Sequence, residues 1–337
     1  MTATRLLHLD VEVTRGDTVE SRHRVHAAVV GPDDQLLATA RDSGLVTMWR
    51  SCAKMFQVLP LLTSGGFDKL SWGEEELALA CASHGGEPEH LAVATRMLAS
   101  IGLEEGDLAC GPHEPLSTRG ARLARESGHP IGRLHNNCSG KHSAMLARAV
   151  TMGWPTRGYE RADHQVQRAC LGEVSSWTGV PVDDMPIAVD GCGVTVMALP
   201  LERMALAYAR WGRAAIAGDE QPARTLHAMR AHPHLVGGTD RFDTVMIGET
   251  NGRVITKVGA EGVHSIAIPD LGIGAAIKVE DGALRAQHVA VVALLQKFGV
   301  LPAELGGKLA EFGSKPIRNT RGETVGVVRA VEEGSDA

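Results

Sequence analysis

The sequence predicts an α+β fold with a central, mainly antiparallel sheet built from N- and C-terminal strands and packed with helices. Alternating apolar and polar residues at 9–14 and 24–30 indicate strands near the amino terminus. Apolar residues at helical spacing dominate the middle of the chain, and strand patterns return after residue 244. Strands at both ends with helices between them predict one domain over residues 1–331, followed by a polar tail at 332–337.

The first half of the chain contains clear start and stop signals for its elements. A third strand at 36–41 completes an early hairpin. A short helix begins near Ser51 and is disturbed at Pro60, because proline lacks the amide donor that a helix interior needs. Ser71 with Glu74 predicts a capping box at the start of the next helix.

The second half alternates between the two periodicities. Pro88 and Gly102 bracket a helix, since proline suits the first helical turn and glycine the position after the last. Strands at 186–189 and 194–198 flank a glycine-rich turn at 190–193. The remaining predicted elements are helices at about 200–216, 221–231 and 283–298, and strands at 244–248, 253–258, 263–268, 272–279 and 324–331.

Composition and charge limit the classes of function. Hydrophobic residues make up 44% of the chain and charged residues 22%, which is typical of a globular protein with a sizeable core. A net charge of −6 without a basic stripe argues against nucleic acid as a partner. No secretory signal or membrane-spanning run is present, so we expect a soluble cytoplasmic protein with six reduced cysteines, and we expect it to form a homodimer.

The segment at 135–142, His-Asn-Asn-Cys-Ser-Gly-Lys-His, concentrates chemically active groups. The apolar run at 144–150 follows it and stops before Gly153, which predicts a helix with the polar cluster at its amino-terminal end. That end favours anions and thiolates, because unpaired N–H groups point outward there. A plain helix start needs only one capping side chain, so the segment predicts a chemical site.

A single Ser-x-x-Lys motif, Ser51 to Lys54, predicts a nucleophile with its base. Residues three apart share one helix face, so the amine reaches the hydroxyl. Arg50 is placed to add positive charge or to hold a substrate carboxylate. Spacing alone favours a simpler alternative, in which Ser51 caps the helix and Lys54 faces solvent.

The order of residues after this motif favours a catalytic role for it. Ser83 lies at the end of a predicted helix, and Lys257 lies on a predicted strand before Val258-Gly259. This order resembles the arrangement in serine β-lactamases and penicillin-binding proteins. Two features differ: there is no Ser-Asp-Asn triplet, and Val258 replaces a hydroxyl residue. A helix-terminal hydroxyl and an exposed strand lysine remain as alternatives.

Two cysteines have surroundings that suit a metal. Cys138 shares a helix face with Lys141, and Cys192 lies in the glycine-rich turn. Two thiolates could bind zinc, although lysine is an unusual ligand and no Cys-x-x-Cys pair is present. The other ligands would come from Lys141, His135, His142 or Asp190. Two unrelated thiols are the alternative.

Taken in order over about residues 10–330, several segments resemble the rhizobial-type L-asparaginase family, also called asparaginase II. The resemblance implies a fold similar to that of serine β-lactamases, penicillin-binding proteins and glutaminases. The segments that carry it are Glu20–His23, Arg50–Gln57, Cys81–Glu87, His135–His142, Asp190–Gly193, Arg241–Thr244, Lys257–Gly262 and Lys315–Asn319.

The resemblance also implies roles for individual residues. Ser51 with Lys54 forms one catalytic dyad, and Ser83 with Lys257 forms a second. A zinc ion that assists substrate binding is held by Cys138, Lys141 and Cys192. The implied substrate-binding residues are Arg50, Asp190, His135 and Asn136. Cys52 and Met55 depart from the family pattern, which has a small residue and a proline there.

The implied activity is that of an L-asparagine amidohydrolase, which releases ammonia and L-aspartate through a serine acyl-enzyme activated by lysine. Two other classes stay open at this point. The chain could be a penicillin-recognising serine hydrolase, which the missing Ser-Asp-Asn triplet disfavours. It could also be a non-catalytic zinc-binding protein in which Ser51 only caps a helix.

Overall fold

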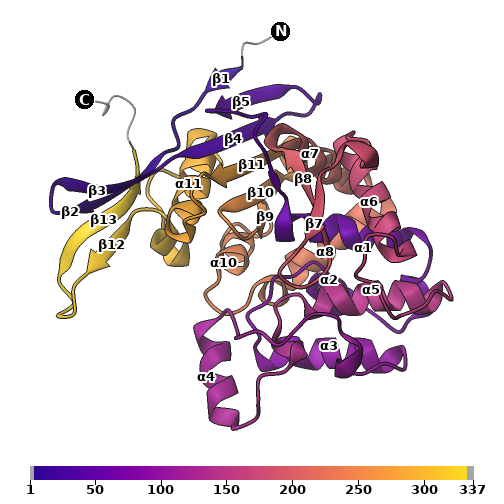
Figure 1. Ribbon diagram of the computed structural model, residues 1–337. Coiled ribbons are helices and arrows are strands. Elements are labelled where there is room, and N and C mark those ends of the chain that lie inside the picture. The colour runs from indigo at the N-terminus through magenta and orange to yellow at the C-terminus, as the bar shows by residue number, and fades with distance from the viewer. Residues whose placement is uncertain (1–3, 332–337) are drawn as a thin grey trace.

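A computed structural model describes residues 4–331 of the chain (Figure 1), so the predicted tail at 332–337 lies outside the described residues. The α+β prediction is confirmed. The strands are β1 (Arg5–Leu6), β2 (Val11–Arg15), β3 (Thr18–His23), β4 (Val25–Val30), β5 (Leu36–Ala40), β6 (Val46–Met48), β7 (Ile187–Val189), β8 (Thr195–Pro200), β9 (Ile255–Val258), β10 (Val263–Ile268), β11 (Ile273–Val279), β12 (Lys315–Arg318) and β13 (Thr324–Ala330).

The α-helices cover most of the middle of the chain. They are α1 (Lys54–Thr63), α2 (Glu74–Ala80), α3 (Pro88–Ser100), α4 (Thr118–Ser127), α5 (Ser139–Thr151), α6 (Gln165–Thr178), α7 (Leu201–Ala217), α8 (Glu220–Ala231), α9 (Pro233–Val236), α10 (Phe242–Glu249) and α11 (Leu284–Lys297). The 3-10 helices η1 (Arg50–Ala53), η4 (Arg133–His135) and η7 (Gly307–Phe312) matter for the site below.

The central sheet has six strands in the order β1-β5-β4-β11-β10-β9. All of its pairs are antiparallel except β1 with β5. The strands at the two ends of the chain share a second sheet, β12-β13-β2-β3, which projects from the body as an arm (Figure 1). The sheet thus joins the termini as predicted, and β9 forms one edge of the central sheet.

Helices cover both faces of the central sheet. Helix α7 packs against β4, β10 and β11, and α11 packs against β10 and β11 (Figure 1). Gly274 permits the close approach of α7, because a Cβ atom there would lie 2.1 Å from the carbonyl oxygen of Ala205. One apolar core therefore joins α7 to the helical part of the molecule, and a second core fills the space under α11.

Three local predictions were wrong. Residues 244–248 are not a strand but most of α10, because Phe242, Val245 and Met246 recur at helical spacing and are buried. Helix α2 is capped by Gly73, whose N–H donates to Glu76 Oε2 at 2.8 Å, and not by Ser71 with Glu74. Helix α1 runs through Pro60 to Thr63 because its whole circumference is buried by tertiary packing.

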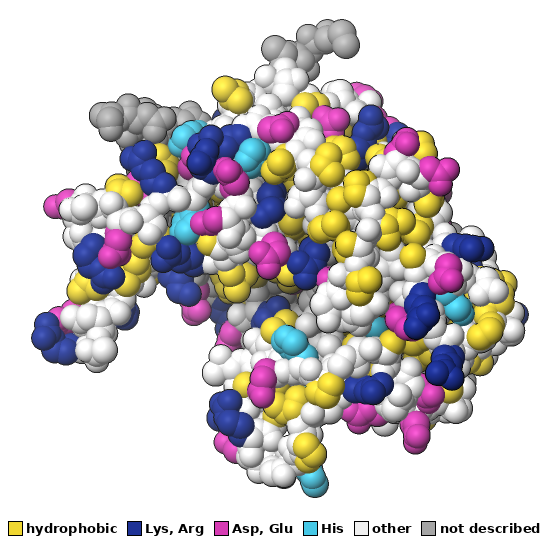
Figure 2. Space-filling view, in the orientation of Figure 1, with side chains coloured by type: hydrophobic (Ala, Val, Ile, Leu, Met, Phe, Trp, Pro, Cys, Tyr) yellow, Lys and Arg dark blue, Asp and Glu magenta, His cyan; other side chains and the backbone are white. Residues whose placement is uncertain are grey.

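The surface carries charges of both signs. Figure 2 shows basic and acidic side chains interspersed over the visible face, in agreement with the small net negative charge. Among residues 4–331, every helix is too short or too polar to cross a membrane.

Candidate active site

Ser51 lies at a strained entry into α1. The preceding residue, Arg50, has a φ of +52°, in the left-handed region that side chains with a Cβ rarely adopt. Its Nε donates to Asp190 Oδ1 at 2.7 Å, which anchors the conformation to the turn between β7 and β8. Because residues three apart eclipse in a 3-10 helix, η1 directs Ser51 and Lys54 to one side.

Two buried lysines converge on Ser83. The Nζ of Lys54 lies 3.0 Å from Ser83 Oγ, and the Nζ of Lys257 lies 2.8 Å from the same atom. Lys54 also donates to the carbonyl oxygens of Ala82 at 2.5 Å and Asn137 at 3.4 Å. These contacts join the start of α1, the end of α2, the loop before α5 and strand β9.

The placement differs from the simple dyad expected for Ser51. Both lysine side chains are fully buried, so the alternative of a solvent-facing Lys54 is wrong. Within residues 4–331, the hydroxyl of Ser51 makes no hydrogen bond to either lysine, and both amines engage Ser83 instead. The structure therefore brings Lys54, Ser83 and Lys257 into one hydrogen-bonded cluster, whereas Ser51 is connected to it only by its position three residues before Lys54 in the chain.

Asp243 is a buried member of this cluster that the sequence analysis did not single out. Its Oδ2 lies 3.7 Å from Lys257 Nζ and accepts the N–H of Val258 at 3.0 Å. Burial raises the pKa of Asp243, but contacts with His264, Lys257 and Val258 outweigh it and hold that pKa below its usual range. Burial lowers the pKa of Lys257 to about 8, against the opposing charge of Asp243.

A second cluster contains the two predicted metal-binding cysteines. Lys141 Nζ lies 3.1 Å from Cys192 Sγ, and Asp190 Oδ2 lies 3.7 Å from the same sulfur. A hydrogen bond from the Cys138 thiol lowers the pKa of Cys192 to about 5, and the same bond together with burial raises the pKa of Cys138 to about 12. The Cys192 thiol is therefore more acidic than an ordinary cysteine, and the amine of Lys141 lies next to it.

This second cluster has the donor chemistry that zinc requires. Two thiols and an amine are the donor types of a zinc site, and the pKa of Cys192 is lowered, but Cys138 and Lys141, whose pKa values are raised, would have to lose their protons to bind. His142 follows Lys141 in α5, and its Nδ1 contacts Tyr159 Oη at 2.5 Å. The residues fit a zinc ion, and Arg50 links them to Ser51 through Asp190.

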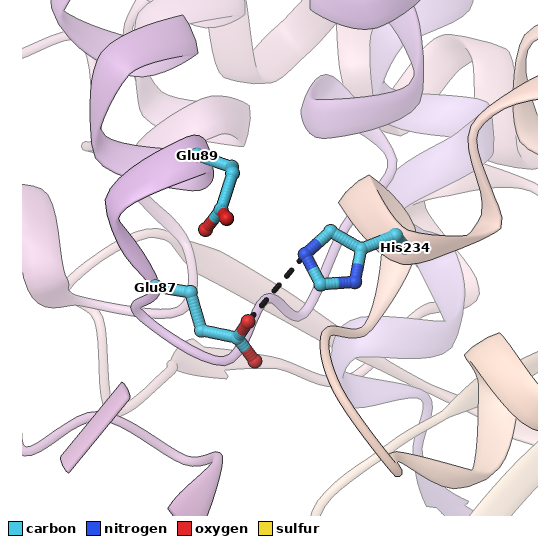
Figure 3. A group of neighbouring side chains, drawn as sticks. All are labelled: Glu87, Glu89 and His234. Carbon is cyan, nitrogen blue, oxygen red and sulfur yellow. Dashed lines mark ion pairs between the residues drawn. The ribbon is translucent and has the colours of Figure 1, made fainter. Parts of the chain in front are cut away.

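Figure 3 shows a different group of possible metal ligands, Glu87, Glu89 and His234, whose ligand atoms lie within 4.8 Å of one another. Arg119 occupies both carboxylates, so they already have a cation. Glu87 also accepts the N–H of Thr239 at 2.7 Å and lies 3.4 Å from His234 Nε2. The group is an ion-pair network that ties the segment after Ser83 to the loop before α10.

His135 and Asn136 shape the loop that leads into α5. The Nδ1 of His135 accepts the N–H of Gly132 at 3.1 Å. Asn136 donates to the carbonyl oxygen of Gly111 at 2.8 Å and accepts the N–H of Cys138 at 2.9 Å. Both side chains hold backbone in place, and their predicted contacts with substrate stay predictions.

Cys52 is buried and donates its thiol to the carbonyl oxygen of Lys257 at 3.0 Å. Burial raises its pKa to about 12, so the thiol is not a reactive nucleophile at neutral pH. Its place is structural, because it connects η1 to strand β9.

A cavity of about 800 Å³ has Asp243 among its lining residues. It is bounded by α4, the start of α10, α11 and η7, and Arg241 and Val258 are among its lining residues. Its volume is within the range of small-molecule sites. The lining does not include Ser51, Ser83 or either buried lysine.

Comparison with known proteins identifies the class and then the family. A family model described as L-asparaginase II matches residues 11–330, which is nearly the whole chain, so the protein is an amidohydrolase. It belongs to the L-asparaginase II family, and the predicted resemblance is confirmed. A search of curated proteins found no match.

Solved structures give only distant similarities. Mglu in its native form is 12% identical, with a TM-score of 0.47, and the match covers 84% of this chain and 66% of that chain. A Bacillus glutaminase crystallised with 4.3 M NaCl is 13% identical, with a TM-score of 0.35, and the match covers 82% of this chain and 91% of that chain.

Proposed function

We propose that the protein hydrolyses L-asparagine to L-aspartate and ammonia through a serine acyl-enzyme. The observation that carries this proposal is the convergence of two buried lysine amines on Ser83 Oγ, one of them from Lys54, three residues after Ser51. Membership of the L-asparaginase II family supports the substrate.

Formation of the acyl-enzyme requires an activated hydroxyl, because an amide is a poor electrophile. Lys54 accepts the proton of Ser51 as Ser51 Oγ forms a bond to the side-chain carbonyl carbon of asparagine. Negative charge develops on the carbonyl oxygen. The first N–H groups of η1 have no acceptor within that helix, so they are available to stabilise the oxyanion.

Collapse of the tetrahedral intermediate needs a proton on the leaving nitrogen. Lys54 passes the proton to Ser83, to which it is hydrogen-bonded. Ser83 in turn gives its own hydroxyl proton to the leaving nitrogen of the substrate. The ammonium group of Lys257 stabilises negative charge at Ser83 during this transfer. Ammonia leaves, and a water molecule then hydrolyses the aspartyl ester by the same relay in reverse.

The substrate carries an ammonium and a carboxylate, so its site needs both charges. Arg50 and Asp190 supply them next to Ser51, and His135 and Asn136 complete the proposed binding residues. Cys138, Lys141 and Cys192 would hold zinc, which supplies positive charge at this side of the pocket and assists binding.

We also propose that the enzyme is a homodimer, which light scattering of the purified protein tests.

Ammonia release from L-asparagine by the purified protein tests the proposal, with L-glutamine and D-asparagine measured alongside. We expect L-asparagine to be hydrolysed. A failure to release ammonia from L-asparagine contradicts the proposed activity. A stable adduct with a β-lactam, detected by intact mass, would instead favour the penicillin-recognising alternative.

Removal of zinc is expected to raise KM more than it lowers the melting temperature, because the thiol cluster borders the proposed pocket and is linked to Ser51 through Asp190 and Arg50. Zinc occupancy should fall on acidification, since metal binding needs thiolates. The measurement is KM and Tm before and after chelation, with zinc added back as the control. Unfolding on chelation would show that the metal is structural.

Substitution of Asp190→Asn is expected to lower kcat/KM for L-asparagine by about 10- to 100-fold, the range for losing a charged hydrogen bond. The change removes the charge that anchors the left-handed conformation of Arg50 next to Ser51. Asp163→Asn, at an exposed position, is the control and should leave kcat/KM unchanged. Equal values for both variants would show that the anchor is dispensable.

A further inference from the structure

Asp243 has the contacts of a residue that sets the charge of its neighbour. It is 2% exposed and lies in the first turn of α10. Besides the contacts of its Oδ2 with Lys257 and Val258, its Oδ1 accepts the hydroxyl of Thr256 at 2.9 Å and lies 3.3 Å from His264 Nε2. All four neighbours are on strands β9 and β10.

We propose that Asp243 is a positioning residue that holds Lys257 as an ammonium ion aimed at Ser83, and that its charge thereby sets the upper pH limit of the reaction. This inference rests on the proposed function, in which the Lys257 ammonium stabilises charge at Ser83.

The first argument is electrostatic. Two amines within 3.0 Å of one hydroxyl oxygen repel each other when both are protonated, and neither is exposed to water. Among residues 4–331, Asp243 is the one carboxylate within 4.0 Å of either amine, and it is on the side of Lys257. Lys54 has only a hydroxyl and carbonyl oxygens around it. Asp243 therefore favours the protonated form of Lys257 over that of Lys54.

The remaining groups that face Asp243 and Lys257 do not replace that charge. Arg241, beside Asp243, is positive, and Lys54, beyond Ser83, also disfavours the Lys257 ammonium whenever Lys54 itself carries a proton. The Cys52 thiol stays protonated because burial raises its pKa to about 12. Burial lowers the pKa of His288 to about 3, so that ring is neutral. The ring of His264 approaches the other oxygen of Asp243.

The second argument separates charge from scaffolding. In Asp243→Asn the amide oxygen can accept the N–H of Val258, and the amide nitrogen can donate to the hydroxyl oxygen of Thr256. The negative charge itself matters to Lys257. Asp243→Asn therefore removes the charge and keeps the scaffold.

The test is the pH profile of L-asparagine hydrolysis. An ammonium requirement means that activity is present below the pKa of Lys257, about 8, and is lost as pH rises through it. Removal of the nearby negative charge lowers that pKa, so in Asp243→Asn we expect the alkaline limb to move down by about one pH unit or more. Thr256→Val, which keeps the carboxylate and removes one hydrogen bond, is the control and should leave the limb in place. An unmoved limb in folded Asp243→Asn overturns the proposal.

A titration that does not depend on activity separates this inference from the proposed function. The ¹⁵N resonance of Lys257 Nζ, assigned by its loss in Lys257→Met, should show an ammonium at pH 7 in the wild type and titrate at lower pH in Asp243→Asn. If L-asparagine is not hydrolysed but this titration behaves as expected, the proposed function fails and the role of Asp243 stands. If Asp243→Asn does not fold, the wild type decides: a neutral Lys257 at pH 7 contradicts the inference.

Discussion

Replacement of Ser51 by alanine is expected to abolish hydrolysis of L-asparagine while the protein keeps its fold. Loss of the nucleophile of a serine hydrolase lowers turnover by on the order of 10⁵-fold or more, because no other step can form the acyl-enzyme. The fold should persist because the hydroxyl of Ser51 makes no hydrogen bond to the described part of the chain, so its removal leaves no buried group unpaired.

The measurement is single-turnover ammonia release together with intact mass of the quenched enzyme. Ser314→Ala, at an exposed position, is the matched control and should keep full activity. Ser83→Ala is the informative comparison. It should slow both the formation and the hydrolysis of the acyl-enzyme, but an adduct should still form on Ser51. An adduct that forms in Ser51→Ala and not in Ser83→Ala would make Ser83 the nucleophile, with the two lysines as its direct partners.

Much of the fold was predictable because it depends on local periodicity. The end of α5 before Gly153, where φ is +68°, and the limits of β10 at 263–268 follow from residue pattern alone. The burial of Lys54 was also predictable in principle. Apart from Lys54, almost all residues of α1 are apolar, so the helix has no polar face on which a lysine could be exposed to water.

Other parts of the site depend on contacts that sequence spacing does not contain. The β-branched residues Thr244, Val245 and Ile247 favour a strand, but burial at helical spacing together with packing against β9 places them in the helix α10. That error hid Asp243, which reaches Lys257 from the first turn of this helix. The left-handed conformation of Arg50 is likewise set by Asp190, 140 positions away in the chain. Ion pairs of this kind are visible only after the chain is folded.

Lys54→Met is the substitution for which we expect the other large effect. It removes the proposed base and the donor to Ser83, so turnover of L-asparagine should fall by on the order of 10⁴-fold. Methionine fills a similar volume in the apolar surroundings of α1 and brings no polar group that burial would leave unpaired, so the variant should fold. Lys69→Met, at an exposed position, controls for the loss of a lysine and should be fully active.

The same variant makes a prediction about Lys257 that does not depend on turnover. Protonated Lys54 lowers the pKa of Lys257, so a variant in which position 54 can never be charged should have a Lys257 pKa above about 8. The ¹⁵N titration of Lys257 Nζ in Lys54→Met measures this shift directly. Opposite movements of this pKa, upward in Lys54→Met and downward in Asp243→Asn, are expected if one ammonium sits between a repelling amine and an attracting carboxylate. A Lys257 titration that is the same in both variants would show that the two lysines do not act as a coupled pair, and the proton relay through Ser83 would then lack its physical basis.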